Sequence, residues 1–131
     1  MVLDPKSIDT VVASNLHADI LTDLAASLSG SMGIAPTANL DPDKRHPSMF
    51  EPIHGSAFDI MGKGIANPIG SYWSAVMMLE NLGELQAAQK LMFAIEKLTE
   101  DKKFLPKDLG GTSTTKQITK AMIDIISGKN N

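Results

Sequence analysis

Residues 50–68 read Phe-Glu-Pro-Ile-His-Gly-Ser-Ala-Phe-Asp-Ile-Met-Gly-Lys-Gly-Ile-Ala-Asn-Pro, and no other stretch of the chain says as much about fold and function. Four apolar residues around Glu51, His54 and Asp59 indicate a segment that is partly anchored in a core. Three glycines, at positions 55, 62 and 64, let the backbone turn sharply and approach a bound molecule closely. Backbone amides, an imidazole, a carboxylate and an amide side chain in one loop suit a polar, phosphate-containing ligand. The glycine spacing by itself fits a surface connection equally well.

The order of residues in this stretch is more specific than the glycine spacing. The run 51–57, then Asp59, then the run 62–68 closely resembles the nucleotide loop of the metal-dependent β-decarboxylating dehydrogenases. That family includes the isopropylmalate, isocitrate, homoisocitrate and tartrate/D-malate enzymes. The resemblance extends upstream to Asn-Leu-His-Ala-Asp-Ile-Leu-Thr-Asp at residues 15–23 and covers nearly the whole chain. Residues 48–51, and Phe58 where isopropylmalate enzymes usually carry proline, look most like the tartrate/D-malate branch.

The composition limits the class of protein. A chain of 131 residues with 43% hydrophobic content is enough for one globular domain with a modest core. The balance of 12 basic and 15 acidic residues, without a basic run, gives nucleic-acid binding little support. The chain has no cysteine, which excludes disulfides and thiolate metal sites and suits the cytosol. Because neither a secretory apolar region nor 18 consecutive apolar residues occur, we expect a cytoplasmic protein with no membrane partner.

The resemblance also implies a fold and a domain division. Members of the family are much longer and the matched motifs fall in their C-terminal part, so we expect this chain to be a C-terminal fragment. The implied fold is α/β, the C-terminal portion of the isopropylmalate-dehydrogenase-like fold, helix-rich with a few strands. It is not a Rossmann fold, because no Gly-x-Gly-x-x-Gly closes a strand-turn-helix. Residues 1–29 would be a piece of the small dimer-forming domain, and residues 30–131 the C-terminal part of the large nucleotide-binding domain.

Local patterns predict the elements of the first half. Residues 8–13 are short, β-branched and flanked by polar residues, which predicts a strand. Asn15 is a good N-cap, and the leucines and isoleucines that follow predict a largely buried helix from about residue 16 to 29. Residues 30–39 are punctuated by glycine and proline and predict a loop. Residues 41–47 predict a charged surface turn, and residues 49–53 a short strand.

The second half is predicted to be mainly helical. Ser71 is the expected cap of a helix that ends near Gly83. Apolar residues on one face predict a second helix over residues 85–98. After a loop at residues 104–111, the last helix is expected to start at Thr114 or Thr115 and to stop at Gly128.

Two carboxylates on the first predicted helix form the candidate metal site. Asp19 and Asp23 are four residues apart, so a helix places them about 40° apart around its axis. Oxygen-only ligands suit Mg²⁺ or Mn²⁺, although a solvated acidic face explains the spacing equally well. The resemblance assigns Asp19 and Asp23 to two divalent-metal ligands, the third carboxylate lying upstream. His17 lies on roughly the opposite side of the helix, where the family commonly carries Phe-Gly in place of His17-Ala18, and is expected to be structural.

The acidic residue of the glycine-containing loop indicates the cofactor. A carboxylate can accept hydrogen bonds from both ribose hydroxyls but repels a 2′-phosphate. In NADP-using relatives a basic or hydroxylated pair replaces the acid, so Asp59 resembles an NAD determinant. The other residues that the resemblance assigns to NAD binding are Glu51, His54, Gly55, Ser56, Ala57 and Asn67.

Each of these residues has an implied role. The His54 imidazole would lie against adenine, the following amides would face phosphate or ribose, and the Asn67 amide would read the adenine edge. Glu51 would approach the nicotinamide end, with a structural hydrogen bond to the loop as its alternative. Lys63 is more simply a solvated loop lysine.

The resemblance implies an NAD- and divalent-metal-dependent homodimeric oxidoreductase. It would transfer a hydride from, and β-decarboxylate, a (2R)-hydroxy dicarboxylate such as tartrate or D-malate. No catalytic residue is assigned in this chain, because the family's lysine base, tyrosine acid and substrate arginines lie upstream, and the chain alone is expected to be inactive. One alternative is an isopropylmalate or isocitrate dehydrogenase of the same family. The other is a non-catalytic dimerisation or interaction module that acts through the helix at residues 16–29.

Overall fold

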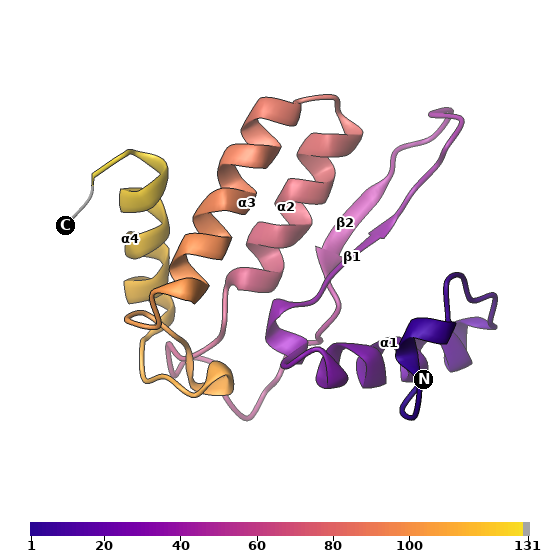
Figure 1. The fold of residues 1–131 in the computed structure, drawn as a ribbon, viewed down its shortest axis with the longest axis horizontal. Coiled ribbons are helices and arrows are strands. Elements are labelled where there is room, and N and C mark those ends of the chain that lie inside the picture. Colours follow the sequence, from indigo (N-terminus) through magenta and orange to yellow (C-terminus); the bar gives the residue numbers. More distant parts are fainter. Residues whose placement is uncertain (130–131) are drawn as a thin grey trace.

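Three helices, packed side by side, carry the core of the protein in the computed structural model, which describes residues 1–129 (Figure 1). The helix α3 packs against both α2 and α4, and a two-stranded hairpin packs on α2. The helices are α1 (Asn15–Leu28), α2 (Ile69–Asn81), α3 (Leu85–Glu100) and α4 (Thr115–Ile126), and the strands are β1 (Pro36–Asn39) and β2 (Met49–Pro52). Short 3-10 helices are η1 (Pro5–Ser7), η2 (Met32–Ile34) and η3 (Lys107–Leu109).

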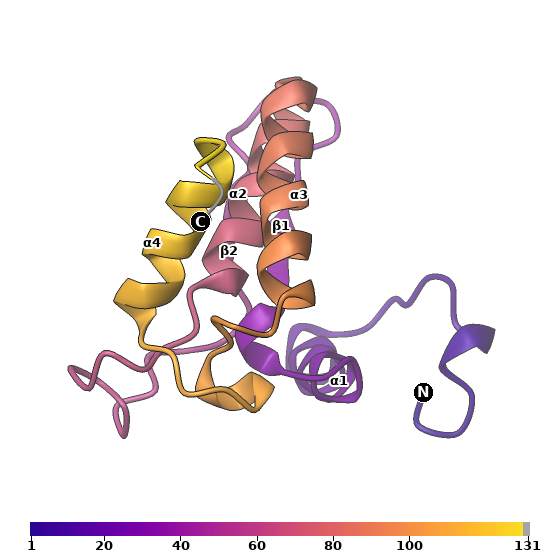
Figure 2. The same cartoon turned by 60° about the vertical axis from the view of Figure 1, so that its left-hand side comes forward.

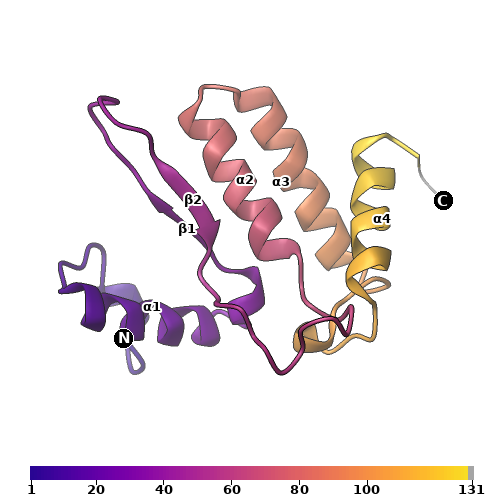
Figure 3. The same ribbon diagram turned by 180° about the vertical axis from the view of Figure 1, so that it is seen from behind.

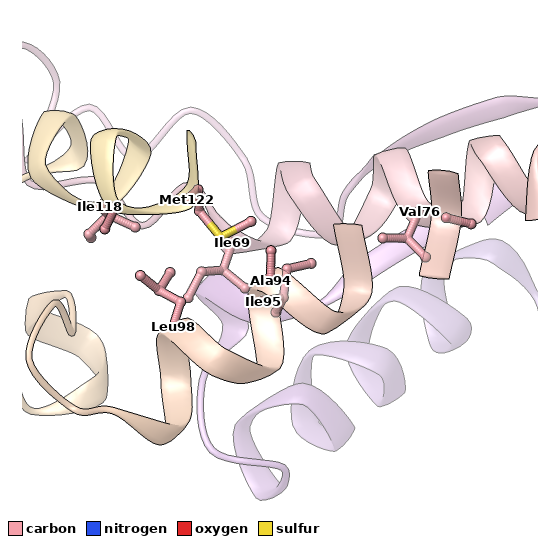
Figure 4. Packing of buried hydrophobic residues seen from close by; sticks show 9 residues of the cluster. Ile69, Val76, Ala94, Ile95, Leu98, Ile118 and Met122 are labelled. Carbon is pink, nitrogen blue, oxygen red and sulfur yellow. The ribbon is translucent and has the colours of Figure 1, made fainter. Parts of the chain in front are cut away.

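The core is formed by the apolar faces of α2, α3 and α4 (Figure 4). The apolar residues of α3 recur every three or four positions, so that one face of the helix is buried while its lysines stay in water. Removal of this apolar surface from water is the main favourable term in folding. The buried residues are Ile69 and Val76 on α2; Ala88, Ala94, Ile95 and Leu98 on α3; and Ile118, Ala121 and Met122 on α4.

Local signals placed the ends of the last helix correctly. The Thr114 side chain accepts a hydrogen bond from the Gln117 backbone N–H, and the Gln117 side chain accepts one from the Thr114 N–H, which is a capping box. Gly128, with φ of 69°, follows the helix end as predicted. The predicted start of α2 was wrong by three residues: the N-cap is Pro68 instead of Ser71, and α2 begins at Ile69.

The hairpin forms partly where a loop was predicted. Residues 36–39 are strand β1, antiparallel to β2 with Thr37 opposite Glu51, so the prediction of a loop over residues 30–39 was wrong. Pro, Ala and Asn have low strand propensity, and here the hydrogen bonds to β2 and the packing on α2 override it. The β2 strand and the charged turn at residues 41–47 are confirmed, since the Asp41 carboxylate accepts hydrogen bonds from the backbone N–H groups of Asp43, Arg45 and His46.

The strand predicted over residues 8–13 is not formed. A strand needs a neighbour for its backbone N–H and C=O groups, and within residues 1–129 the two strands present pair with each other. The segment has no regular secondary structure and is exposed, with Val12 98% accessible. Figure 2 shows that the residues before α1 lie apart from α2, α3 and α4.

Helix α1 is correctly predicted in position but not in burial. It begins at Asn15 with Ser14 as its N-cap, one residue earlier than expected. Only Ala26 is buried, while Ile20 is 59% accessible, so the expected largely buried helix is wrong for this chain. The reason is that α1 packs mainly against the short η2 segment, which covers little of its apolar face.

No helix among residues 1–129 combines the length and apolar character that crossing a membrane requires.

The assignment of the core predicts the cost of two matched substitutions in α3. Leu98 is 2% accessible, so Leu98→Ala is expected to lower the free energy of unfolding by about 3 kcal/mol through lost burial and a cavity. Leu85 is 58% accessible, and Leu85→Ala is expected to cost less than about 1 kcal/mol. Urea denaturation followed by circular dichroism measures both values. Equal losses in the two variants would contradict this core.

Candidate functional site

The segment that resembles a nucleotide loop connects β2 to α2 and is called here the glycine loop (residues 53–68). It runs from the end of β2 to the N-terminal end of α4 and returns to the start of α2 (Figure 3). Thr115, the first residue of α4, fixes it at two points. The Thr115 backbone N–H donates to the Gly64 carbonyl at 2.9 Å, and the Thr115 hydroxyl donates to the Ala66 carbonyl at 2.5 Å.

The backbone of the glycine loop is tightly turned. The Ile60 N–H donates to the Ala57 carbonyl at 3.0 Å, and the Lys63 N–H donates to the Ile60 carbonyl at 3.1 Å. Gly62 and Gly64 have φ of 74° and 66°, in the left-handed region that favours glycine. Ala57 also lies there, with φ of 43°, although its Cβ makes this conformation costly. Such strain is a feature of ligand-binding loops.

Most of the predicted cofactor residues lie on open surface. Glu51 is exposed on β2 and Asp59 is exposed in the glycine loop, whereas His54 and Asn67 are half-buried. Gly55, Ser56 and Ala57, whose backbone N–H groups are the predicted donors to the cofactor, are also exposed. The Asp59 carboxylate forms no ion pair within residues 1–129, since the ion pairs there join Arg45 to Asp43, Lys97 to Glu100 and Lys120 to Asp124. Its oxygens are therefore available to ligand hydroxyls.

His54 and Asn67 both have partners within the protein. One ring nitrogen of His54, Nδ1, lies 3.1 Å from the Gly55 carbonyl oxygen. The Asn67 side-chain oxygen accepts from the Ile69 N–H at 2.9 Å, and its amide nitrogen donates to Asp108 Oδ2 at 2.9 Å. Both the oxygen and the nitrogen of the Asn67 amide thus already have a partner within the protein. One of the two Nδ2 hydrogens remains available to a ligand. Its role as a reader of the adenine edge stays a prediction.

The candidate metal ligands lie on α1. Asp19 is exposed and Asp23 is half-buried, one helical turn apart. The nearby hydroxyls of Thr22 and Ser27 donate to the backbone carbonyls of Asp19 and Asp23, which leaves the two carboxylates for other partners. His17 instead bonds to the Ser14 hydroxyl at 2.7 Å, in agreement with a structural role.

The donor set on α1 fits a hard cation in kind but is incomplete. Residues 1–129 contain no group of three or more His, Cys, Asp or Glu side chains that could hold a metal ion. Two carboxylate oxygens suit Mg²⁺ or Mn²⁺, which keep several waters and substrate oxygens among their ligands. A complete site would need donors beyond those that these residues supply.

Two hollows of the structure lie away from the predicted site residues. A groove of about 940 Å³ between α3 and α4 is lined in part by Phe93, Leu98 and Phe104. On its rim the Lys97 ammonium donates to Glu100 at 2.7 Å, and this hydrogen bond lowers the pKa of the exposed Glu100 carboxyl. A second hollow, of about 540 Å³, lies beside Trp73 and Met92. No residue of the predicted site lines either of these two hollows.

Sequence reasoning missed three residues that hold the glycine loop in place. Thr115 was noticed only as a possible start of a helix, and Asp108 and Ser31 had no signal in their local sequence. Their hydrogen-bond partners are 41 to 77 positions away in the sequence, and a contact at that range leaves no local pattern.

Comparison with known proteins identifies the family. Residues 1–126 match the isocitrate/isopropylmalate dehydrogenase family. The chain belongs to this family. The expected fold class is therefore confirmed, and the solved structures agree: an isocitrate dehydrogenase from Methylococcus capsulatus superposes with a TM-score of 0.88 at 39% identity, over 99% of this chain and 38% of that one.

The curated relatives of the chain are dehydrogenase/decarboxylases. A probable tartrate dehydrogenase/decarboxylase from Agrobacterium vitis is 61% identical over 130 residues, which are 99% of this chain and 36% of the relative. A tartrate dehydrogenase/decarboxylase from Pseudomonas putida is 48% identical over 96% of this chain and 36% of its own length. A D-malate dehydrogenase [decarboxylating] from Escherichia coli is 47% identical over 95% of this chain and 36% of its own. The chain thus spans about a third of the length of these relatives.

The anchoring of the glycine loop on α4 predicts the effect of a substitution outside the loop. Thr115→Val removes the hydroxyl that donates to the Ala66 carbonyl and keeps the side-chain shape. Amide hydrogen exchange at residues 60–66 is expected to become about tenfold faster, because a local opening loses roughly one hydrogen bond. Thr112→Val, at an exposed threonine of the preceding loop, is the control and should leave exchange unchanged. Unaltered exchange in Thr115→Val would show that the Thr115 hydroxyl does not hold the loop.

Proposed function

We propose that this chain contributes the nucleotide loop and two metal carboxylates to an NAD-dependent β-decarboxylating dehydrogenase. Its substrate class would be a (2R)-hydroxy dicarboxylate such as tartrate or D-malate, as the names of the relatives suggest. The observation that carries the proposal is a pre-turned glycine loop, held by Thr115, that exposes the unpaired Asp59 carboxylate. The family match supports a nucleotide as the ligand of this arrangement.

Each residue has a defined task in this proposal. Asp59 accepts hydrogen bonds from the adenosine ribose hydroxyls, and the amides of Gly55, Ser56 and Ala57 donate to ribose or phosphate oxygens. Asp19 and Asp23 hold Mg²⁺ or Mn²⁺. When bound, NAD⁺ and the metal supply a hydride acceptor and a Lewis acid that stabilises negative charge on the substrate oxygens.

The proposal assigns the proton transfers of the reaction to groups outside this sequence. The single tyrosine, Tyr72, is half-buried between α2 and α4, where its hydroxyl lies 2.7 Å from the Thr119 hydroxyl. It is therefore committed to packing and is a poor acid for a bound substrate. The proposal places the base, the acid, the third metal carboxylate and the substrate arginines on a further polypeptide segment, and the assembled enzyme in the cytoplasm.

A second candidate is a dimerisation module without catalysis. The apolar side chains Leu16, Ile20, Leu24 and Leu28 are all exposed and recur every four residues along α1. Such a stripe favours a partner surface of similar character. A homodimer through α1 is compatible with both candidate functions. Only the catalytic activity of an assembled enzyme therefore distinguishes the dehydrogenase from the dimerisation module.

The proposal is tested by a chimera in which this chain replaces the matched segment of the Agrobacterium vitis relative. The chimera is expected to reduce NAD⁺ with tartrate or D-malate when Mn²⁺ is present. Asp23→Asn should lower kcat at least about 100-fold, because a metal ligand loses its charge, and leave the Kd for NAD⁺ unchanged. Asp9→Asn, at an exposed carboxylate before α1, is the matched control. Full activity of Asp23→Asn at low Mn²⁺ would refute the metal assignment, and a folded but inactive chimera would favour the dimerisation module.

Cofactor choice provides an independent test at Asp59. The chimera is expected to prefer NAD⁺ over NADP⁺, because a carboxylate close to a 2′-phosphate costs on the order of 1 kcal/mol in a partly screened site. Asp59→Lys should narrow the ratio of kcat/KM for the two cofactors at least about fivefold, since the repulsion is replaced by attraction. Asp101→Lys makes the same charge change at an exposed site outside the loop and should leave the ratio unchanged. Equal kcat/KM for both cofactors before any substitution would contradict the role of Asp59.

A further inference from the structure

One carboxylate oxygen joins three segments that are far apart in the sequence. Asp108 Oδ2, on η3, accepts a hydrogen bond from the Asn67 amide at 2.9 Å and another from the Ser31 hydroxyl at 2.5 Å. Ser31 follows the end of α1 and is only 8% accessible, and Asn67 lies at the end of the glycine loop. Hydrogen bonds to a charged acceptor are stronger than neutral ones, so this carboxylate is a firm junction.

The junction is closely packed. A Cβ added to Gly33 would lie 2.5 Å from Asp108 Oδ2 and 3.1 Å from the Asn67 side chain. The Gly33 N–H also donates to the Ser31 hydroxyl oxygen at 2.9 Å, which directs the Ser31 hydrogen toward Asp108. The backbone at Gly33 therefore leaves the Asp108 carboxylate little room to move away from its two donors.

The junction also fixes which way the Asn67 amide points. Of the two ends of the Asn67 amide, only the oxygen can accept from the Ile69 N–H, and only the NH₂ group can donate to the Asp108 carboxylate. A reversed amide would lose both bonds. Since the same Asn67 oxygen bonds the first residue of α2, Asp108 sets the conformation in which the glycine loop enters that helix.

We propose that Asp108 is a positioning residue of the nucleotide site, acting through Asn67 to hold the end of the glycine loop in the conformation that binds NAD⁺. This role rests on the proposed function of the loop. Asp108 touches no reacting group in this proposal: it determines the affinity for the cofactor and not the chemistry. Thr115 holds the loop at residues 64 and 66, and Asp108 holds it at residue 67.

The test uses the 131-residue chain labelled with ¹⁵N and followed by NMR, first without ligand and then with NAD⁺. In the absence of NAD⁺, Asp108→Ala should move the Asn67 side-chain amide signals toward those of a solvent-exposed amide. On titration, Asp108→Ala should raise the Kd for NAD⁺ about tenfold, the effect expected for losing a charge-assisted hydrogen bond that fixes the site. Asp108→Asn should retain most of the affinity, because an amide oxygen can still accept both bonds. Asp101→Ala, at an exposed carboxylate after α3, is the control for the general loss of a negative charge.

A double-mutant cycle shows whether Asp108 acts through Asn67. In an Asn67→Ala background, Asp108→Ala is expected to have no further effect on the Kd for NAD⁺, because the group it positions is gone. An unchanged Kd in the single Asp108→Ala variant, or the same tenfold effect in the Asn67→Ala background, overturns the positioning role alone. If NAD⁺ causes no shifts at residues 53–67 of the unsubstituted chain, the cofactor assignment of the loop falls and the positioning role falls with it.

Discussion

The packing of α3 between α2 and α4 is the constraint on which the remainder of the structure depends. Leu98 of α3 and Ile118 of α4 are almost fully removed from water in one buried cluster, and the packing of α3 against α4 fixes α4 relative to the other helices. The first residue of α4 then holds the carbonyls of Gly64 and Ala66. The glycine loop therefore depends on the apolar core for its shape, because the core positions the helix to which the loop is hydrogen-bonded. A core substitution in α3 is expected to disturb the loop even though the substituted residue lies outside the loop.

The helices α2, α3 and α4 could be predicted because their signals are local. Apolar spacing along α3, the Thr-x-x-Gln capping pattern at Thr114 and the glycine after α4 all lie within the element that they describe. The pairing of β1 could not be predicted, since its partner residues are 10 to 16 positions away and its own sequence favours a loop. Residues 8–13 show the converse: a strand-like sequence forms no strand when no neighbour is there to pair with it.

The candidate site divides in the same way. The motifs on α1 and in the glycine loop are contiguous stretches of sequence, so the family and its fold could be predicted from them. The supporting contacts of Ser31 and Asp108 join residues up to 77 positions apart, and only coordinates reveal them. The predicted burial of α1 was wrong for a different reason. An apolar stripe indicates that a helix face is more stable when covered, but it does not identify the surface that covers it.

The left-handed backbone at Ala57 has a thermodynamic consequence for any ligand of the glycine loop. A non-glycine residue in this conformation costs on the order of 1 kcal/mol, and here the cost is met during folding, before a ligand arrives. The loop therefore gives up less conformational entropy at the moment of binding than a mobile loop would. Pre-organisation of this kind raises the affinity for such a ligand, because a smaller ordering cost is subtracted from the free energy of binding.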